Sequence, residues 1–171
     1  MRPLLRLQLP ATLGSDLAGV VVEVGSRVTR FKPGDAVFAS MDELHMGALA
    51  EFAVVAEKAA ALKPAHLDFV QAASIPMVAL TSWQALTERA RIAPGQKVFI
   101  SAGAGGIGTC AIQLAKRLGA TVATTTSAGN ADLVRSLGAD EVIDYQKQNF
   151  ADVLRDYDVV LDTLGGDSLA R

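Results

Sequence analysis

The sequence is poor in the residues that build disulfides and metal centres. Its 171 residues include one cysteine, Cys110, and two histidines, His45 and His66. A single cysteine excludes an intrachain disulfide framework and any metal site made of several thiolates. Two histidines cannot alone supply the three protein ligands of a catalytic zinc site. We therefore predict that the chain binds no metal.

The sequence also lacks a charge excess and a long hydrophobic run. Lysine and arginine number 16, aspartate and glutamate number 18, and the net charge is −2 at pH 7. This balance does not favour nonspecific attraction to nucleic acid or to an anionic membrane. No apolar run approaches the ~20 residues of a membrane span. With 50% hydrophobic and 20% charged residues, the composition is typical of a soluble protein, and we expect it in the cytoplasm.

The first half of the chain has the pattern of short strands. Segments 18–25, 28–39 and 47–56 are apolar or β-branched, and the second contains a Pro-Gly-Asp turn. Strands at this spacing predict an antiparallel barrel or sandwich. A helical linker is expected over 69–90, interrupted at Pro76, and we place the boundary between the halves near residue 80.

The second half alternates between strand and helix patterns. Two of its strand segments, "VFIS" and "VVLD", lack polar alternation, as expected for strands that are covered on both faces. Alternation of this kind predicts βαβ units and a parallel sheet. The predicted strands are 97–101, 121–125, 141–144 and 158–162, and the predicted helices are 106–118, 130–137 and 149–155.

A glycine-rich turn follows the first strand of this half. Gly103, Gly105 and Gly108 form G-x-G-x-x-G between an apolar strand and an amphipathic helix. In a dinucleotide-binding turn the first glycine permits the tight turn, the second admits the pyrophosphate, and the third lets the helix pack closely. The helix N-terminus then offers N–H groups and a positive dipole end to phosphates. The alternative is a strand-to-helix turn without a ligand.

The strand after the turn ends without an acidic residue. An NAD site carries Asp or Glu about 20 residues after the glycines, where it bonds the ribose 2′-hydroxyl, but no acid occurs here before Asp132. Hydroxyls and amides can instead donate to phosphate oxygens, so Thr126, Ser127 and Asn130 are candidate contacts to a 2′-phosphate. The absence of the acid favours NADP(H) over NAD. Arg135 could assist or could face solvent, and the whole segment could also be a simple polar loop.

Four segments of the sequence, taken together and in this order, resemble the medium-chain dehydrogenase/reductase superfamily. The resemblance is to its zinc-independent quinone oxidoreductase branch, the zeta-crystallin-like enzymes. It implies a GroES-like β-barrel domain on the substrate side, followed by a doubly wound Rossmann domain. The segments are "LGSDLAGVVVEVGSRVTRFKPGDAVFA" (13–39), "IPMVALTSWQAL" (75–86), "AGAGGIGTCAIQLAK" (102–116) and "LGADEVIDY" (137–145).

The resemblance assigns roles in the cofactor site, residue by residue. Its pyrophosphate turn corresponds to Gly105, Gly106 and Ile107, and its 2′-phosphate contacts correspond to Ser127 and Asn130. Two further positions match residues beside the bound cofactor: Tyr145 at the adenine ribose phosphate and Thr81 near the reactive end. Tyr145 could equally be a half-packed tyrosine at a strand end. Thr81 could equally be a helix hydroxyl bonded to its own backbone.

The resemblance also bears on the substrate pocket and on zinc. Relatives use the loop after the second strand segment to line the pocket, which here places Met41, Leu44 and Met46 there; a flexible surface loop is equally compatible. Zinc-dependent members carry Gly-His-Glu where this chain has Gly14-Ser15-Asp16, and they carry a four-cysteine lobe that this sequence lacks. The resemblance therefore implies a zinc-independent protein.

The implied activity is hydride transfer from NADPH to a quinone or conjugated carbonyl. The resemblance predicts an incomplete α/β pair of domains: residues 1–80 from the GroES-like domain and residues 81–171 from the Rossmann domain, in which only four of six strands are expected. Family members also form homodimers. Two alternatives remain open: a non-catalytic NADPH-binding module that acts as sensor or structural partner, and an enoyl-thioester reductase of the same superfamily.

Overall fold

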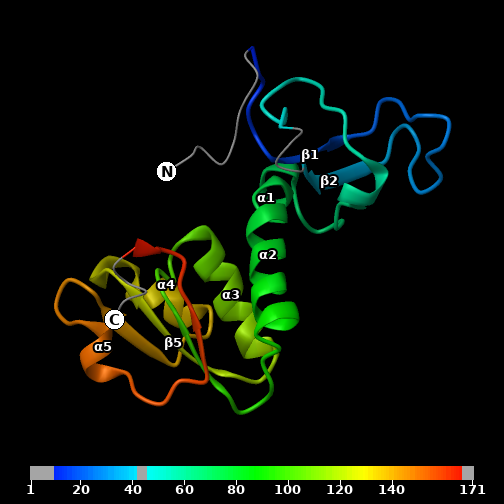
Figure 1. The fold of residues 1–171 in the computed structure, drawn as a ribbon. Helices are drawn as coiled ribbons and strands as arrows, with labels where there is room; N and C mark the ends of the chain where they lie inside the picture. Colours follow the sequence, from blue (N-terminus) through cyan, green and yellow to red (C-terminus); the bar gives the residue numbers. More distant parts are fainter. Residues whose placement is uncertain (1–9, 42–45, 167–171) are drawn as a thin grey trace. The chain divides into compact units, whose positions relative to one another are not determined.

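The chain forms two compact units, which divide inside a helix. The computed structural model describes residues 10–41 and 46–166. Unit 1 is Met1–Met77 and unit 2 is Val78–Arg171. The boundary falls within helix α2 (Pro76–Trp83), which is labelled in Figure 1.

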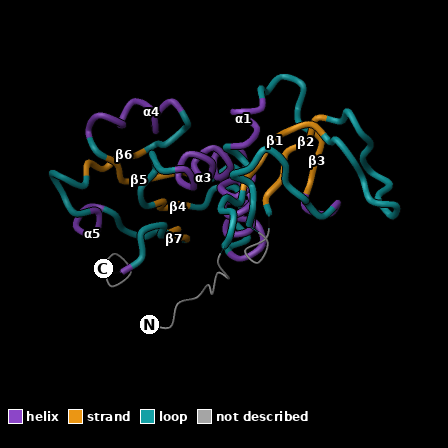
Figure 2. Tube along the Cα trace, turned by 90° about the horizontal axis from the view of Figure 1, so that it is seen from above, coloured by secondary structure: helices purple, strands orange, loops and turns teal. Residues whose placement is uncertain are grey.

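Unit 1 contains an antiparallel sheet of three strands in the order β1-β2-β3 (Figure 2). In its register, Ala18 of β1 lies opposite Phe38 of β2, and Phe38 lies opposite Ala61 of β3. Helix α1 packs against β1 and β2. This sheet is the antiparallel part that the first half of the sequence predicts. Its elements are β1 (Asp16–Val20), β2 (Ala36–Ser40), the 3-10 helix η1 (Glu57–Ala59), β3 (Ala60–Leu62) and α1 (Phe69–Ala73).

Two strand predictions in this half are wrong: one predicted strand ends earlier than expected, and another segment is not a strand. The first strand ends at Val20 rather than Gly25. Segment 47–56 forms no strand among the described residues, although its sequence is apolar. A strand needs a partner for its backbone groups, and here the N–H groups of Gly47 and Ala48 both donate to the Gly14 carbonyl instead. Farther along this segment, side chains remain exposed, as in Val54 (93%).

The linker between the halves is helical with a break, as predicted. Helix α1 begins with a reciprocal capping box between Asp68 and Gln71 and ends at Ala73. Pro76 then starts α2, where a proline is tolerated because the first helical N–H has no helical partner. The next N–H, of Met77, donates to the Asp16 carboxylate (3.1 Å), which satisfies another of these free donors. The helical path continues beyond α2 as the π-helix η2 (Gln84–Arg89).

Unit 2 contains a parallel sheet of four strands in the order β6-β5-β4-β7. Numbered by their order in this unit, the strands run 3-2-1-4, which is the order of the first half and first crossover strand of a doubly wound Rossmann sheet. The alternation predicted from the sequence is thus confirmed. The elements are β4 (Lys97–Ile100), α3 (Gly106–Arg117), β5 (Thr121–Thr126), η3 (Ala128–Asn130), α4 (Ala131–Ser136), β6 (Glu141–Asp144), α5 (Phe150–Val153) and β7 (Val159–Leu161).

The core of unit 2 lies between the central strands and the helices. Ile100 of β4, Val122 of β5 and Ile112 of α3 are fully buried. Each such side chain contributes about 1.5–3 kcal/mol when it leaves water, so this cluster holds β4, β5 and α3 together. None of the helices in the described ranges is both long enough and apolar enough to span a membrane.

Helices α3 and α4 both end in the sequence Leu-Gly-Ala. Gly119 and Gly138 adopt φ of +86° and +108°, which only glycine adopts at little cost. The alanine that follows, Ala120 or Ala139, donates its N–H to the carbonyl five residues earlier, at 3.0 and 3.1 Å. This is the Schellman termination of a helix, and it returns the chain to the next strand in each βαβ unit.

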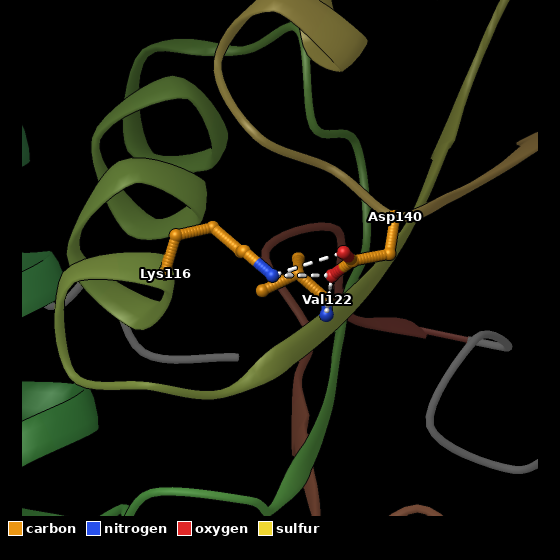
Figure 3. A network of polar contacts seen from close by, with 3 residues as sticks. All are labelled: Lys116, Val122 and Asp140. Carbon is orange, nitrogen blue, oxygen red and sulfur yellow. Dashed lines mark hydrogen bonds and ion pairs between the residues drawn. The ribbon is translucent and has the colours of Figure 1, made fainter.

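A charged contact joins α3, β5 and the turn before β6 (Figure 3). The Lys116 ammonium lies 2.9 and 2.7 Å from the two carboxylate oxygens of Asp140, and the Val122 N–H donates to the same carboxylate at 2.7 Å. Partial burial alone would raise the pKa of Asp140, but the hydrogen bonds from Lys116 and Val122 and the Lys116 charge hold that pKa below its ordinary value of 3.8. The ionised carboxylate therefore stabilises the folded unit.

We expect Asp140→Ala to lower the free energy of unfolding by about 1 to 2 kcal/mol at pH 7. Charge-assisted hydrogen bonds contribute about 1.5–3 kcal/mol, discounted here because the side chain is 41% exposed. A depressed folded-state pKa gives stability that is present above the unfolded-state pKa and is lost as pH falls through the folded value. Urea unfolding should thus show a smaller difference from the parent at pH 3 than at pH 7. Glu88→Ala is the control, and an equal loss at both pH values would contradict the charge argument.

Candidate cofactor site

The glycine-rich turn begins where β4 ends, at the carboxyl edge of the parallel sheet. The N–H groups of Ala102 and Gly103 donate to the Thr125 hydroxyl and carbonyl, at 3.0 and 2.9 Å. Ala102 adopts φ +52°, a left-handed conformation that costs a residue with a side chain about 1 kcal/mol or more. The contacts with β5 therefore hold this turn in a conformation that the isolated chain would not favour.

Gly103 permits the tight turn because it has no side chain. The residue with positive φ is Ala102, not Gly103. A Cβ on Gly103 would instead lie 2.9 Å from the Thr124 Cγ2 atom and 3.0 Å from the Ile112 Cδ1 atom, and closer still to the Thr124 hydroxyl. The absence of a side chain at Gly103 thus lets the turn pass against β5 and α3.

Gly108 and Gly105 face different surroundings. A Cβ on Gly108 would lie 2.7 Å from the Gly103 Cα atom and would collide with the Ala102 carbonyl oxygen. The close approach of helix and turn therefore requires this glycine. A Cβ on Gly105 would meet only the Ala102 oxygen, at 3.2 Å, and its backbone is extended (φ −77°, ψ 167°). Packing within the described residues leaves the other side of Gly105 open.

Helix α3 starts directly after Gly105, without a capping side chain. The first turn of a helix has N–H groups without intrahelical partners, and here these belong to Gly106, Ile107 and Gly108. The N-terminus also carries the positive end of the helix dipole. The arrangement can therefore bind an anion with main-chain N–H groups.

Helix α2 supports this first turn. The Ser82 hydroxyl donates to the Val78 carbonyl (2.8 Å) and lies 3.2 Å from the Ile107 carbonyl, and Ser82 is buried. A Cβ on Gly106 would lie 3.0 Å from the Val78 Cγ1 atom. Thr81, which the sequence places near the reactive end of a cofactor, lies half-buried on the same helix.

A second polar cluster joins the ends of β4 and β7, the two strands at which the chain order of the sheet reverses. The Ser101 hydroxyl donates to the Asp162 carboxylate (2.8 Å) and accepts from the Thr163 N–H (2.8 Å). The Thr163 hydroxyl in turn donates to the Ser101 carbonyl (3.1 Å). Ligands of doubly wound sheets bind at this reversal point. Sequence reasoning missed the pair because 61 residues separate its members.

The end of β5 opens into a small cavity. Thr126 is buried, Ser127 precedes η3, and the Asn130 amide lies 3.4 Å from the Ser127 hydroxyl. The cavity has a volume of about 190 Å³, which suits one group of a ligand rather than a whole one. Its lining combines two of the predicted contacts with side chains of α4, β6 and the turn after β6. The lining residues are Thr126, Ser127, Ala128, Ala131, Arg135, Val142, Asp144 and Lys147.

Two charged lining residues, Asp144 and Lys147, were not identified from the sequence. Asp144 ends β6 and Lys147 follows it by one turn, with 3.7 Å between the ammonium nitrogen and a carboxylate oxygen. Arg135, for which the sequence left two possibilities, does line the cavity, and its guanidinium pairs with Asp132 at 3.2 Å. The register of β5 with β6 places Asp144 opposite Thr126, which no local pattern reveals.

The remaining predicted residues lie in diverse places. Tyr145 is 61% exposed, and its N–H donates to the Thr126 carbonyl at 3.3 Å. Met41 follows β2, and its N–H donates to the Ser15 carbonyl. Met46 is half-buried, whereas Leu44 lies outside the described residues.

The groups near the turn include one thiol and no cluster of metal ligands among the described residues. Burial raises the pKa of the Cys110 thiol on α3, so this side chain is a neutral thiol at pH 7. Within residues 10–41 and 46–166, no three His, Cys, Asp or Glu side chains are grouped so that they could hold a metal ion. The arrangement can position an anionic, nucleotide-like ligand by main-chain N–H groups at one end and hydroxyls at the other.

Comparison with known proteins matches both halves of the chain. Residues 3–65 match the alcohol dehydrogenase GroES-like domain, and residues 106–171 match the family described as zinc-binding dehydrogenase. A 2-methylene-furan-3-one reductase of Solanum lycopersicum is 45% identical over 165 residues. A chloroplastic NADPH-dependent alkenal/one oxidoreductase of Arabidopsis thaliana is 46% identical over 165 residues.

Solved structures agree with these matches. The Escherichia coli quinone oxidoreductase complexed with NADPH superposes with a TM-score of 0.90 at 32% identity, over 98% of this chain and 53% of that one. The match to each of the two plant relatives covers 92% of this chain and 42% of the relative. The chain thus spans less than half the length of these curated relatives.

Proposed function

This chain belongs to the medium-chain dehydrogenase/reductase superfamily, and on that premise we propose that it binds NADPH as part of an oxidoreductase. The proposed reaction transfers hydride to a quinone or conjugated carbonyl. The observation that carries the proposal is the open first turn of α3 beside Gly105, at the carboxyl edge of the parallel sheet. The fit to a dinucleotide is supported by Gly105, where a Cβ would meet only the Ala102 oxygen and the other side of the turn is open to a diphosphate.

The residues of this chain would hold the two ends of the adenosine diphosphate moiety. The N–H groups of Gly106 and Ile107 would donate to the pyrophosphate, and the dipole of α3 would favour its charge. Ser127 and Asn130 would donate to the 2′-phosphate. The bound cofactor supplies the hydride, while the protein contributes binding, orientation and exclusion of water.

The substrate class follows from what the named relatives share. A methylene-furanone, an alkenal or enone and a quinone are all electron-poor systems in which a C=C bond is conjugated to a carbonyl. We propose that Thr81 lies near the reactive end of the cofactor and that Met41, Leu44 and Met46 line the substrate side. A non-catalytic NADPH-binding module is the second candidate.

Titration of the full chain with NADPH, followed by an assay of NADPH oxidation, tests the proposal. The panel contains a small quinone, a 2-alkenal, an enone and an enoyl thioester. A saturable complex with turnover of the quinone, the alkenal and the enone supports the proposed oxidoreductase. Preferential turnover of the enoyl thioester would instead identify the protein as an enoyl reductase. Binding without turnover supports the module. Absence of a saturable complex in a folded sample would falsify the NADPH site.

Ser127→Asp should shift the coenzyme preference toward NADH. The new carboxylate would lie beside the proposed 2′-phosphate, and two charges ~4 Å apart repel by about 1 to 4 kcal/mol, so NADPH should bind about tenfold more weakly. The affinity for NADH should change little. Ser26→Asp, in an exposed turn of unit 1, is the control with the same change in charge. An unaltered ratio of the two dissociation constants would remove Ser127 from the site.

Three further features complete the proposal. We propose that the protein is zinc-independent, since Gly14, Ser15 and Asp16 replace the Gly-His-Glu of zinc-dependent members, and metal analysis of the purified chain checks this.

We also propose a cytoplasmic homodimer. Light scattering during gel filtration measures its mass, and fractionation of the source cells tests its location.

A further inference from the structure

The cavity at the end of β5 contains a carboxylate with an unsatisfied oxygen. Asp144 is only 17% exposed, and its Oδ1 atom accepts a hydrogen bond from the Gln146 N–H at 3.1 Å. The Oδ2 atom is buried and accepts no hydrogen bond among the described residues. Its compensating charge is the Lys147 ammonium, 3.7 Å away. A buried polar atom of this kind requires a partner or an explanation.

The cations of the cavity come from outside the loop that follows β5. Ser127, Ala128, Gly129 and Asn130 carry no charge. Of the two cations that line the cavity, Arg135 pairs with Asp132 on its own helix, where both side chains are largely exposed. Lys147 instead lies beside the buried Asp144 carboxylate and is itself 77% exposed. It can therefore turn toward a ligand while it remains close to its partner.

We infer that Asp144 and Lys147 are an opposed pair that sets the coenzyme preference of this site, an inference that depends on the proposed function. Lys147 attracts a 2′-phosphate, whereas the Asp144 carboxylate, which lines the same cavity, repels it and favours an unphosphorylated ribose. The acid that the sequence lacks at the end of β5 is thus supplied by the neighbouring strand, opposite Thr126. The two side chains are specificity residues; neither takes part in hydride transfer.

Binding of two adenosine fragments to the full chain tests the pair. Adenosine 2′,5′-bisphosphate carries the 2′-phosphate and 5′-AMP lacks it, and neither needs the nicotinamide side. Lys147→Gln should weaken binding of the bisphosphate about threefold to tenfold, the range of one charge contact near a surface, and leave 5′-AMP nearly unchanged. Asp144→Asn, which keeps the oxygen that accepts from Gln146, should strengthen bisphosphate binding and weaken 5′-AMP binding by about threefold each.

The double variant and two controls complete the experiment. In the Asp144→Asn background, Lys147→Gln should cost less bisphosphate affinity than in the parent, because the lysine no longer offsets a carboxylate. Lys58→Gln and Asp152→Asn, at exposed positions, control for net charge. If the parent binds both fragments but the ratio of their affinities is the same in every variant, the pair has no such role. If the parent binds neither fragment, the proposed nucleotide site fails, and the inference fails with it.

Discussion

Gly108→Val is expected to lower the free energy of unfolding of unit 2 by about 3 kcal/mol. The first atom of the new side chain would lie 2.7 Å from the Gly103 Cα atom and 2.8 Å from its carbonyl carbon, and it would also overlap the Ala102 carbonyl oxygen. All three are backbone atoms of a turn that β5 already fixes, so no side-chain rotation relieves the overlap. Overpacking of this kind costs about 1–3 kcal/mol or more, whereas valine gains only a few tenths of a kcal/mol over glycine in a helix.

Gly129→Val provides the matched comparison for this effect. A Cβ at Gly129 has no neighbour within 4 Å, so the same substitution should change the unfolding free energy little. Urea unfolding of both variants, followed by far-UV circular dichroism, measures the difference. Equal stability of the two variants would mean that α3 and the turn can separate without cost, and the packing account of the third glycine would then be wrong.

The sequence predicts most of unit 2 because its patterns are local and agree with one another. The short runs that become β4 and β5, the first apolar and the second rich in β-branched threonine and valine, stand between helix patterns, and each βαβ unit follows from this order. The ends of α3 and α4 are predictable for the same reason, since Gly119 and Gly138 mark the left-handed residues. Unit 1 is less predictable. Segment 47–56 is as apolar as β2, but whether it pairs depends on a partner strand that its own residues do not specify.

The candidate site shows the same limit. The motif identifies the glycine positions, but it does not predict that the left-handed torsion belongs to Ala102, whose N–H contacts Thr125. Asp144 and Lys147 reach the cavity only through the pairing of β5 with β6. Spacing along the chain cannot reveal residues that sheet register brings together, and two of the charged residues of the cavity are of this kind.

Gly105→Val separates ligand binding from folding, because Gly105 has little structural reason to be glycine. Its backbone (φ −77°, ψ 167°) suits a β-branched residue, and its Cβ would meet only the Ala102 oxygen, at 3.2 Å. The valine methyl groups would instead occupy the space beside the free N–H groups of Gly106 and Ile107. We expect unchanged unfolding by urea together with an NADPH dissociation constant raised by at least about a hundredfold.

That magnitude follows from the number of contacts that a displaced pyrophosphate loses. Two charge-assisted hydrogen bonds contribute about 3–6 kcal/mol, and each 1.4 kcal/mol is a factor of about ten in affinity. Gly105→Ala should give an intermediate loss, and Gly25→Val, whose Cβ meets no neighbour within 4 Å in unit 1, should give none. A graded loss across this series, with stability constant, locates the pyrophosphate at this turn. Unchanged NADPH affinity in a folded Gly105→Val protein would instead place the ligand elsewhere, because no backbone N–H at the start of α3 can reach a phosphate through a valine side chain.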